Sequence, residues 1–186
     1  YVRVTLFVAP VSVLIPPNNV YNVYQMSVPV DDTHNIIYIV AWTDTGPGVE
    51  LEAWRRFTGT QIGLDLDKTY RKINDITKNY GQDRQLMRLG NFTGIRGFPN
   101  QDIAMQESMG AIADRSGERL GASDVAIVEF RRLMIKAARE FTEGKRPPGI
   151  GVKASEYASY GSWERVVPKS TDWRNFEPYP AKIAAE

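Results

Sequence analysis

The segment from about Ser123 to Glu143 constrains the fold most, because its apolar residues recur at steps of three and four. The apolar positions are Ala126, Ile127, Phe130, Leu133, Met134, Ala137, Ala138 and Phe141. This spacing places them on one side of an α-helix and leaves charged residues on the other side. Ser123 or Asp124 can cap the start of the helix, and Gly144 is placed to end it. The mixed charges favour packing on a core over a position on a membrane surface.

The first 42 residues predict a β-sheet. Residues 2–9, 11–15, 21–30 and 36–42 are rich in valine, isoleucine and aromatic side chains and carry few charges. Turn-forming residues separate these runs, and the short connections favour an antiparallel meander. A short helix is expected at 51–57, followed by an irregular polar stretch over about 70–91. Several strands followed by a long helix predict an α+β fold.

Composition limits the function classes. The 23 basic and 22 acidic residues give a net charge of +1, which argues against a nucleic-acid partner or an anionic membrane surface. No apolar run approaches the roughly 18–20 residues needed to span a bilayer. The absence of cysteine fits a reducing compartment, so a cytoplasmic location is expected. The 42% hydrophobic content is sufficient for a core of one domain.

Asp102 is the acidic residue that most needs an explanation. Asn100 is a plausible N-cap, which would place Asp102 in the first turn of a helix. A carboxylate there complements the helix dipole by roughly 0.3–1 kcal/mol, and most acidic residues in first turns have no other role. Composition and spacing alone leave this structural interpretation open.

A longer pattern surrounds Asp102. It runs as Gln101-Asp102-x-Ala104-Met105-x-Glu107-x-Met109-Gly110, followed by Asp114-Arg115-Ser116 and Ser123-Asp124. This pattern resembles the catalytic domain of Rieske non-haem iron oxygenases, and more narrowly the phthalate dioxygenase branch. The resemblance extends over about positions 1–143. It implies a helix-grip fold, in which a curved antiparallel sheet wraps on a long C-terminal helix. Residues 1–144 would form the C-terminal part of the iron-binding catalytic domain, and 145–186 an extended tail with aromatic anchors that include Trp163, Trp173, Phe176 and Tyr179.

The resemblance also implies a metal site. In this family two histidines and one carboxylate hold a mononuclear iron, and Asp102 matches the carboxylate position. The chain has one histidine, His34, and no cysteine. A Rieske 2Fe-2S cluster needs two Cys and two His, and the iron needs two further His ligands. The chain is therefore expected to be a C-terminal portion, with those ligands upstream. His34 lies in a polar turn and is expected to be exposed, while Glu107 is either an exposed glutamate or a residue behind the metal ligands.

The function implied for the parent enzyme is hydroxylation of an aromatic substrate with dioxygen. Electrons would come from NADH through a ferredoxin-type reductase and the Rieske cluster, and the protein would form a homotrimer or a larger homo-oligomer. Phthalate or another aromatic carboxylate is the expected substrate, while dioxygenation, monooxygenation and O-demethylation all remain open. Two alternatives also remain: a metal-free helix-grip module that binds an apolar or aromatic ligand, and a structural or interaction fragment in which Asp102 is dispensable.

Overall fold

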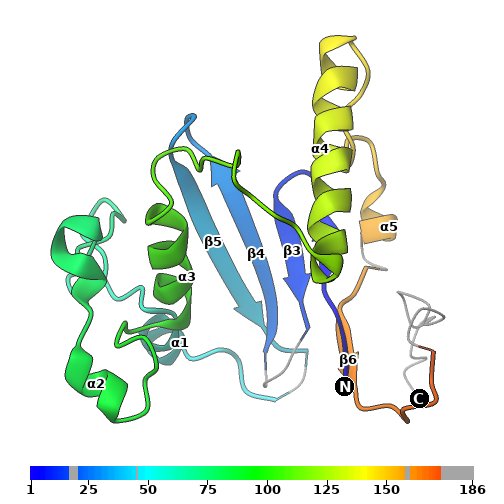
Figure 1. Cartoon of the computed structure of the whole chain (residues 1–186). Coiled ribbons are helices and arrows are strands. Elements are labelled where there is room, and N and C mark those ends of the chain that lie inside the picture. The colour runs from blue at the N-terminus through cyan, green and yellow to red at the C-terminus, as the bar shows by residue number, and fades with distance from the viewer. Residues whose placement is uncertain (17–20, 45, 158–159, 173–186) are drawn as a thin grey trace. The chain divides into compact units, whose positions relative to one another are not determined.

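The computed structural model describes residues 1–16, 21–44, 46–157 and 160–172. The chain forms two compact units, one made of Tyr1–Gly48 with Arg119–Glu186 and the other of Val49–Glu118. We call them the sheet unit and the helical unit. Helices occur together with two antiparallel sheets, so the predicted α+β fold is confirmed (Figure 1). No helix in the described ranges is long and apolar enough to cross a membrane.

The sheet unit contains a four-stranded sheet in the order β2-β3-β4-β5. The strands are β2 (Leu6–Val8), β3 (Ser12–Ile15), β4 (Asn22–Pro29) and β5 (Asn35–Trp42). They fall within or close to the predicted runs. Asp31 organises the turn between β4 and β5, because its carboxylate accepts hydrogen bonds of 2.8 Å from the backbone N–H groups of Thr33 and His34. This is the local bonding by which aspartate favours turns.

Strand β5 has apolar side chains on both faces. Its alternate residues on one face are each at least 37% exposed: Ile36, Tyr38, Val40 and Trp42. The residues between them, Ile37, Ile39 and Ala41, are half-buried. Tyr24 and Met26 of β4 pair with Val40 and Tyr38, so the apolar face continues onto the neighbouring strand, where both side chains are half-buried. Strands that are apolar on both faces are typical of sheets covered on both sides.

The long helix is confirmed and labelled α4 (Val125–Thr142). A 3-10 turn, η2 (Ala122–Asp124), precedes it, and the Asp124 carboxylate accepts the backbone N–H of Gly121 at 2.8 Å. Gly144 adopts φ 79°, and its N–H donates to the Phe141 carbonyl at 3.0 Å, so glycine ends the helix as predicted. Helix α4 lies on the β3 side of the sheet (Figure 1).

The contact between α4 and the sheet is carried by aromatic rings. Phe130 meets Phe7 of β2 edge to face, with ring centroids 5.1 Å apart. This contact confirms that α4 packs on the sheet. The burial is partial, because Ile127, Phe130 and Leu133 each remain more than 40% exposed.

Part of the segment after residue 144 returns to the sheet unit. It contains α5 (Ala154–Tyr157) and β6 (Trp163–Arg165), and β6 pairs antiparallel with β1 (Val2–Val4). Trp163 is thus a strand residue opposite Val4. The other predicted anchors, Trp173, Phe176 and Tyr179, lie outside the described residues.

The helical unit contains four short helices. They are α1 (Leu51–Thr58), η1 (Ile76–Gly81), α2 (Arg84–Arg88) and α3 (Phe98–Glu107). Helix α1 was expected, but the expectation of an irregular stretch over 70–91 was only partly right. Asp75 and Asp83 cap η1 and α2 by accepting the backbone N–H groups of Thr77 and Gln85 at 3.0 and 2.7 Å. Helices of five or six residues are too short to show an apolar periodicity, which is why pattern reasoning missed them.

Candidate functional site

Helix α3 carries Asp102, and its start differs from the predicted one. The N-cap is Gly97 and not Asn100, so Asp102 is the fifth residue of the helix and lies beyond the first turn. Pro99 is tolerated near the helix start because the N–H that proline lacks would have no partner within the helix. The Asn100 side chain is occupied elsewhere: its Nδ2 donates to the carbonyls of Arg96 at 2.8 Å and Gly59 at 3.3 Å.

A close approach of two glycines docks the start of α3 on the end of α1. Gly59 and Gly97 have φ values of 64° and 77°, and a Cβ on Gly97 would lie 2.7 Å from the Gly59 Cα. Thr58 and Ala104, which lie in α1 and α3, are each only 1% exposed. Because glycine alone fits both the backbone conformation and this approach, these residues determine where α3 begins.

Asp102 projects from the exposed side of α3. Its side chain is exposed and makes no hydrogen bond or ion pair with the residues that the structure describes. The neighbouring Gln101 instead bonds inward, through Nε2 to the Ile95 carbonyl at 3.2 Å. A carboxylate held on a docked helix without a protein partner can accept a cation, so this observation fits one oxygen ligand of a metal site.

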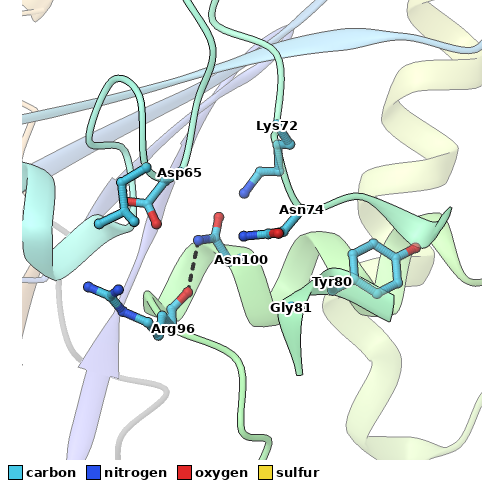
Figure 2. A pocket seen from close by; sticks show the side chains of 8 residues that line it. Asp65, Lys72, Asn74, Tyr80, Gly81, Arg96 and Asn100 are labelled. Carbon is cyan, nitrogen blue, oxygen red and sulfur yellow. Dashed lines mark hydrogen bonds between the residues drawn. The ribbon is translucent and has the colours of Figure 1, made fainter. Parts of the chain in front are cut away.

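A polar cavity of about 60 Å³ lies within the helical unit. Its polar lining includes Asp65, Lys72, Asn74, Arg96 and Asn100, and Figure 2 shows these side chains gathered around it. The sequence patterns did not predict this cavity, because most of its residues come from the loops and short turns between α1 and α3. The signal available in the sequence was weak: polar and charged residues clustered over 65–82.

Burial alters the titration of two groups at this cavity. Loss of hydration lowers the pKa of the Lys72 ammonium, an effect that the charges of Glu107 and Asp65 partly offset. Loss of hydration also raises the pKa of the Tyr80 phenol, and the nearby Glu107 carboxylate raises it further. Glu107 therefore acts electrostatically on groups that line the cavity. The Glu107 side chain is exposed, which agrees with the first of its two expected interpretations, and a role behind the metal ligands stays a prediction.

Comparison with known proteins identifies the family. The LigXa C-terminal domain-like family matches residues 1–185. The chain belongs to this family. It is 52% identical over 177 residues to the phthalate 4,5-dioxygenase oxygenase subunit of Pseudomonas putida, a match that covers 95% of this chain and 40% of that protein. It is 33% identical over 191 residues to the 3-chlorobenzoate-3,4-dioxygenase oxygenase subunit of Comamonas testosteroni, which covers 93% of this chain and 43% of that protein.

These relatives confirm the resemblance to the phthalate dioxygenase branch. This LigXa C-terminal domain-like chain spans less than half the length of either relative. Among the described residues, no group of three or more His, Cys, Asp or Glu side chains is arranged to hold a metal ion. Asp102 is therefore a single candidate ligand and not part of a ligand set within the described chain.

His34 lies in the turn between β4 and β5, where the sequence predicted a turn. Its imidazole is exposed, and Nδ1 lies 2.9 Å from Oδ1 of Asp31 and 2.9 Å from Oγ1 of Thr33. The turn belongs to the sheet unit, whereas Asp102 belongs to the helical unit. These contacts explain His34 as a turn residue, as expected from the sequence.

Proposed function

We propose that this chain forms the C-terminal part of the iron-binding catalytic domain of a Rieske oxygenase that hydroxylates an aromatic carboxylate such as phthalate. The observation that carries this proposal is the 52% identity, over 95% of the chain, to an oxygenase subunit named for phthalate 4,5-dioxygenation. The second relative, named for a chlorobenzoate, also acts on an aromatic carboxylate by its name. The names of both relatives favour an oxygenase over a metal-free binding module.

In this proposal Asp102 supplies the carboxylate ligand, and two histidines outside the chain complete the site. Iron favours a set of two histidines and one carboxylate that leaves open positions, and the chemistry it supplies when bound is activation of dioxygen. Electrons would reach the site from NADH through a ferredoxin-type reductase and a Rieske 2Fe-2S cluster. Assembly as a homotrimer or larger ring belongs to the same proposal.

The chain itself contributes orientation. The fifth position of α3 directs the Asp102 carboxylate away from the buried side of the helix, where Ala104 and Pro99 pack. The glycine contact and the two Asn100 hydrogen bonds fix where α3 begins. A ligand that is held before the metal arrives loses little conformational freedom on binding, which strengthens the site.

Replacing Asp102 by Ala in the intact protein tests the proposal. The expected result is loss of mononuclear iron and of turnover, with the Rieske centre retained, measured by iron analysis and by the spectrum of the cluster. Asp32→Ala, at an exposed turn residue of the sheet unit, is the matched control and should keep both metals and activity. Unchanged iron content and turnover in Asp102→Ala would refute the assignment of the ligand.

A further inference from the structure

The polar cavity of the helical unit lies apart from the exposed Asp102 and calls for its own explanation. The Asn100 Nδ2 bonds to the Gly59 and Arg96 carbonyls, while its Oδ1 is buried and has no hydrogen-bond partner among the residues that the structure describes. Those two carbonyls fix the amide orientation, so the oxygen must be the atom left without a partner. A buried acceptor of this kind is unfavourable unless a bound group donates a hydrogen to it.

The charges that line the cavity are unbalanced. Lys72 and Arg96 contribute two positive charges, and Asp65 contributes the one carboxylate among the lining residues, while the Glu107 carboxylate acts on Lys72 from outside the lining. Neither cation forms an ion pair or a side-chain hydrogen bond with any described residue. Lys72 is also partly desolvated, which lowers its pKa. Figure 2 shows the Lys72 ammonium and the Asn74 and Asn100 amides turned toward one another, with Asp65 facing them. A negatively charged group placed among them would face the Lys72 ammonium, while the exposed guanidinium of Arg96 lies at the edge of this group of side chains in Figure 2.

The acceptors restrict which anion can enter. The Oδ2 atom of Asp65 already accepts the backbone N–H of Gln61 at 3.0 Å. An ionised carboxylate can accept further hydrogen bonds but cannot donate one to a ligand. An oxyanion without an O–H group would therefore lie beside two oxygen acceptors, the Asn100 Oδ1 and the Asp65 carboxylate, without a hydrogen to donate to either. An oxyanion that carries an O–H can donate to Asn100 or Asp65 and accept from Lys72 and Arg96.

Cavity size restricts the ligand further. A volume of about 60 Å³ is large enough for several water molecules. It is well below the roughly 150 Å³ cavity that accommodates benzene. The aromatic substrate of the proposed function therefore does not fit, and the ligand must be a small one.

We infer that this cavity binds a small oxyanion that carries an O–H group, such as hydrogen phosphate or bicarbonate. Lys72 and Arg96 bind its charge, and the Asn100 carbonyl oxygen accepts its hydrogen. Because the cavity joins the loops after α1 to the start of α3, occupancy stabilises the helical unit. The inference does not depend on the iron chemistry proposed for Asp102.

Isothermal titration calorimetry of the intact protein at neutral pH tests the inference, with phosphate, bicarbonate and sulfate compared at one ionic strength. Sulfate carries no O–H at this pH and serves as the control anion. The expected result is saturable binding of phosphate or bicarbonate at one site, with sulfate at least tenfold weaker. Binding of phosphate alone or of bicarbonate alone would each support the inference and identify the ligand.

Variants assign the binding to the cavity. Lys72→Gln and Arg96→Gln are each expected to weaken binding at least tenfold, whereas Lys68→Gln, at an exposed lysine of the same unit, leaves it unchanged. The inference fails if neither phosphate nor bicarbonate binds, if sulfate binds as tightly, or if Lys72→Gln binds like the parent. Should Lys72→Gln fail to fold, the comparison of the three anions on the parent protein still decides.

Discussion

Replacing Gly97 by Ala is expected to loosen the start of α3 and so to disturb the placement of Asp102. Gly97 adopts φ 77° and ψ 123°, a positive-φ conformation that favours glycine, and a Cβ there would lie 2.7 Å from the Gly59 Cα, 2.8 Å from the Gly59 nitrogen and 2.9 Å from the Thr58 carbonyl oxygen. All three neighbours are backbone atoms of the end of α1, so no side chain can rotate to make room. The backbones of α1 and α3 must move apart.

The magnitude combines two costs. A non-glycine residue in the left-handed region costs about 1–2 kcal/mol, and overpacking of a buried contact costs about 1–3 kcal/mol more. We therefore expect Gly97→Ala to lower the free energy of opening of the helical unit by about 2–5 kcal/mol. Gly63 separates the two costs, since it has φ 86° with no atom within 4 Å of an added Cβ, and Gly63→Ala should cost about 1–2 kcal/mol.

Hydrogen exchange measures the effect locally. The amides of 98–107 in the intact protein report the opening of α3, without requiring that the whole molecule unfold in one step. Gly117→Ala is the matched control, because it has neither a positive φ nor a nearby atom, and it should change stability by less than about 0.5 kcal/mol. If the amides of 98–107 exchange no faster in Gly97→Ala than in Gly63→Ala, the close approach of the two glycines does not hold the helix.

Two further outcomes are expected in the sheet unit. Phe130→Ala removes the ring contact with Phe7 and should lower the free energy of unfolding by about 1–2 kcal/mol. The loss is smaller than for a fully buried phenylalanine because Phe130 is 42% exposed. Chemical denaturation compares this variant with Phe92→Ala, at a ring that is 92% exposed, and equal losses of stability in the two variants would contradict the prediction. The backbone hydrogen bond from Thr33, together with His34, lowers the pKa of Asp31 from 3.8 to about 2. Because the folded pKa is the lower one, this carboxylate stabilises the turn fully above pH 3.8, and the stabilisation is lost as the pH falls through about 2. NMR titration of the Asp31 carboxyl carbon measures the midpoint, and a value near 3.8 would refute the bonding in the turn.

Much of the sheet unit could be predicted from the sequence, because local signals there agree with the tertiary fold. The strands β4 and β5 follow from two apolar runs on either side of a turn, and in that turn the Asp31 carboxylate accepts the backbone N–H of Thr33. Helix α4 follows from its periodicity and from Gly144, whose φ of 79° ends it. Pairing of β6 with β1 could not be predicted, since the two strands are only three residues long and lie about 160 residues apart in the chain.

At the candidate site, tertiary contacts decide more than local sequence signals do. Asp102 was singled out by the pattern around it, yet its position in the helix was mistaken, because Asn100 resembles an N-cap in the sequence and instead bonds to Gly59, 41 residues earlier. Only the tertiary contact between Gly59 and Gly97 decides that α3 starts at Phe98 and that Asp102 lies beyond its first turn. The polar cavity likewise depends on loops whose conformations arise from contacts distant in sequence.

The sequence by itself determined the elements whose signals are local: the amphipathic helix, the β-meander with its turn, and the family to which the chain belongs. The tertiary structure alone decided where α3 begins, that the Asn100 oxygen is buried without a partner in the described part of the chain, and that Lys72 and Arg96 line one cavity. The physical reason is the distance along the chain over which each kind of interaction acts. Periodicity, turn bonding and helix termination act over a few residues, whereas burial and close backbone approach join residues that the sequence keeps apart.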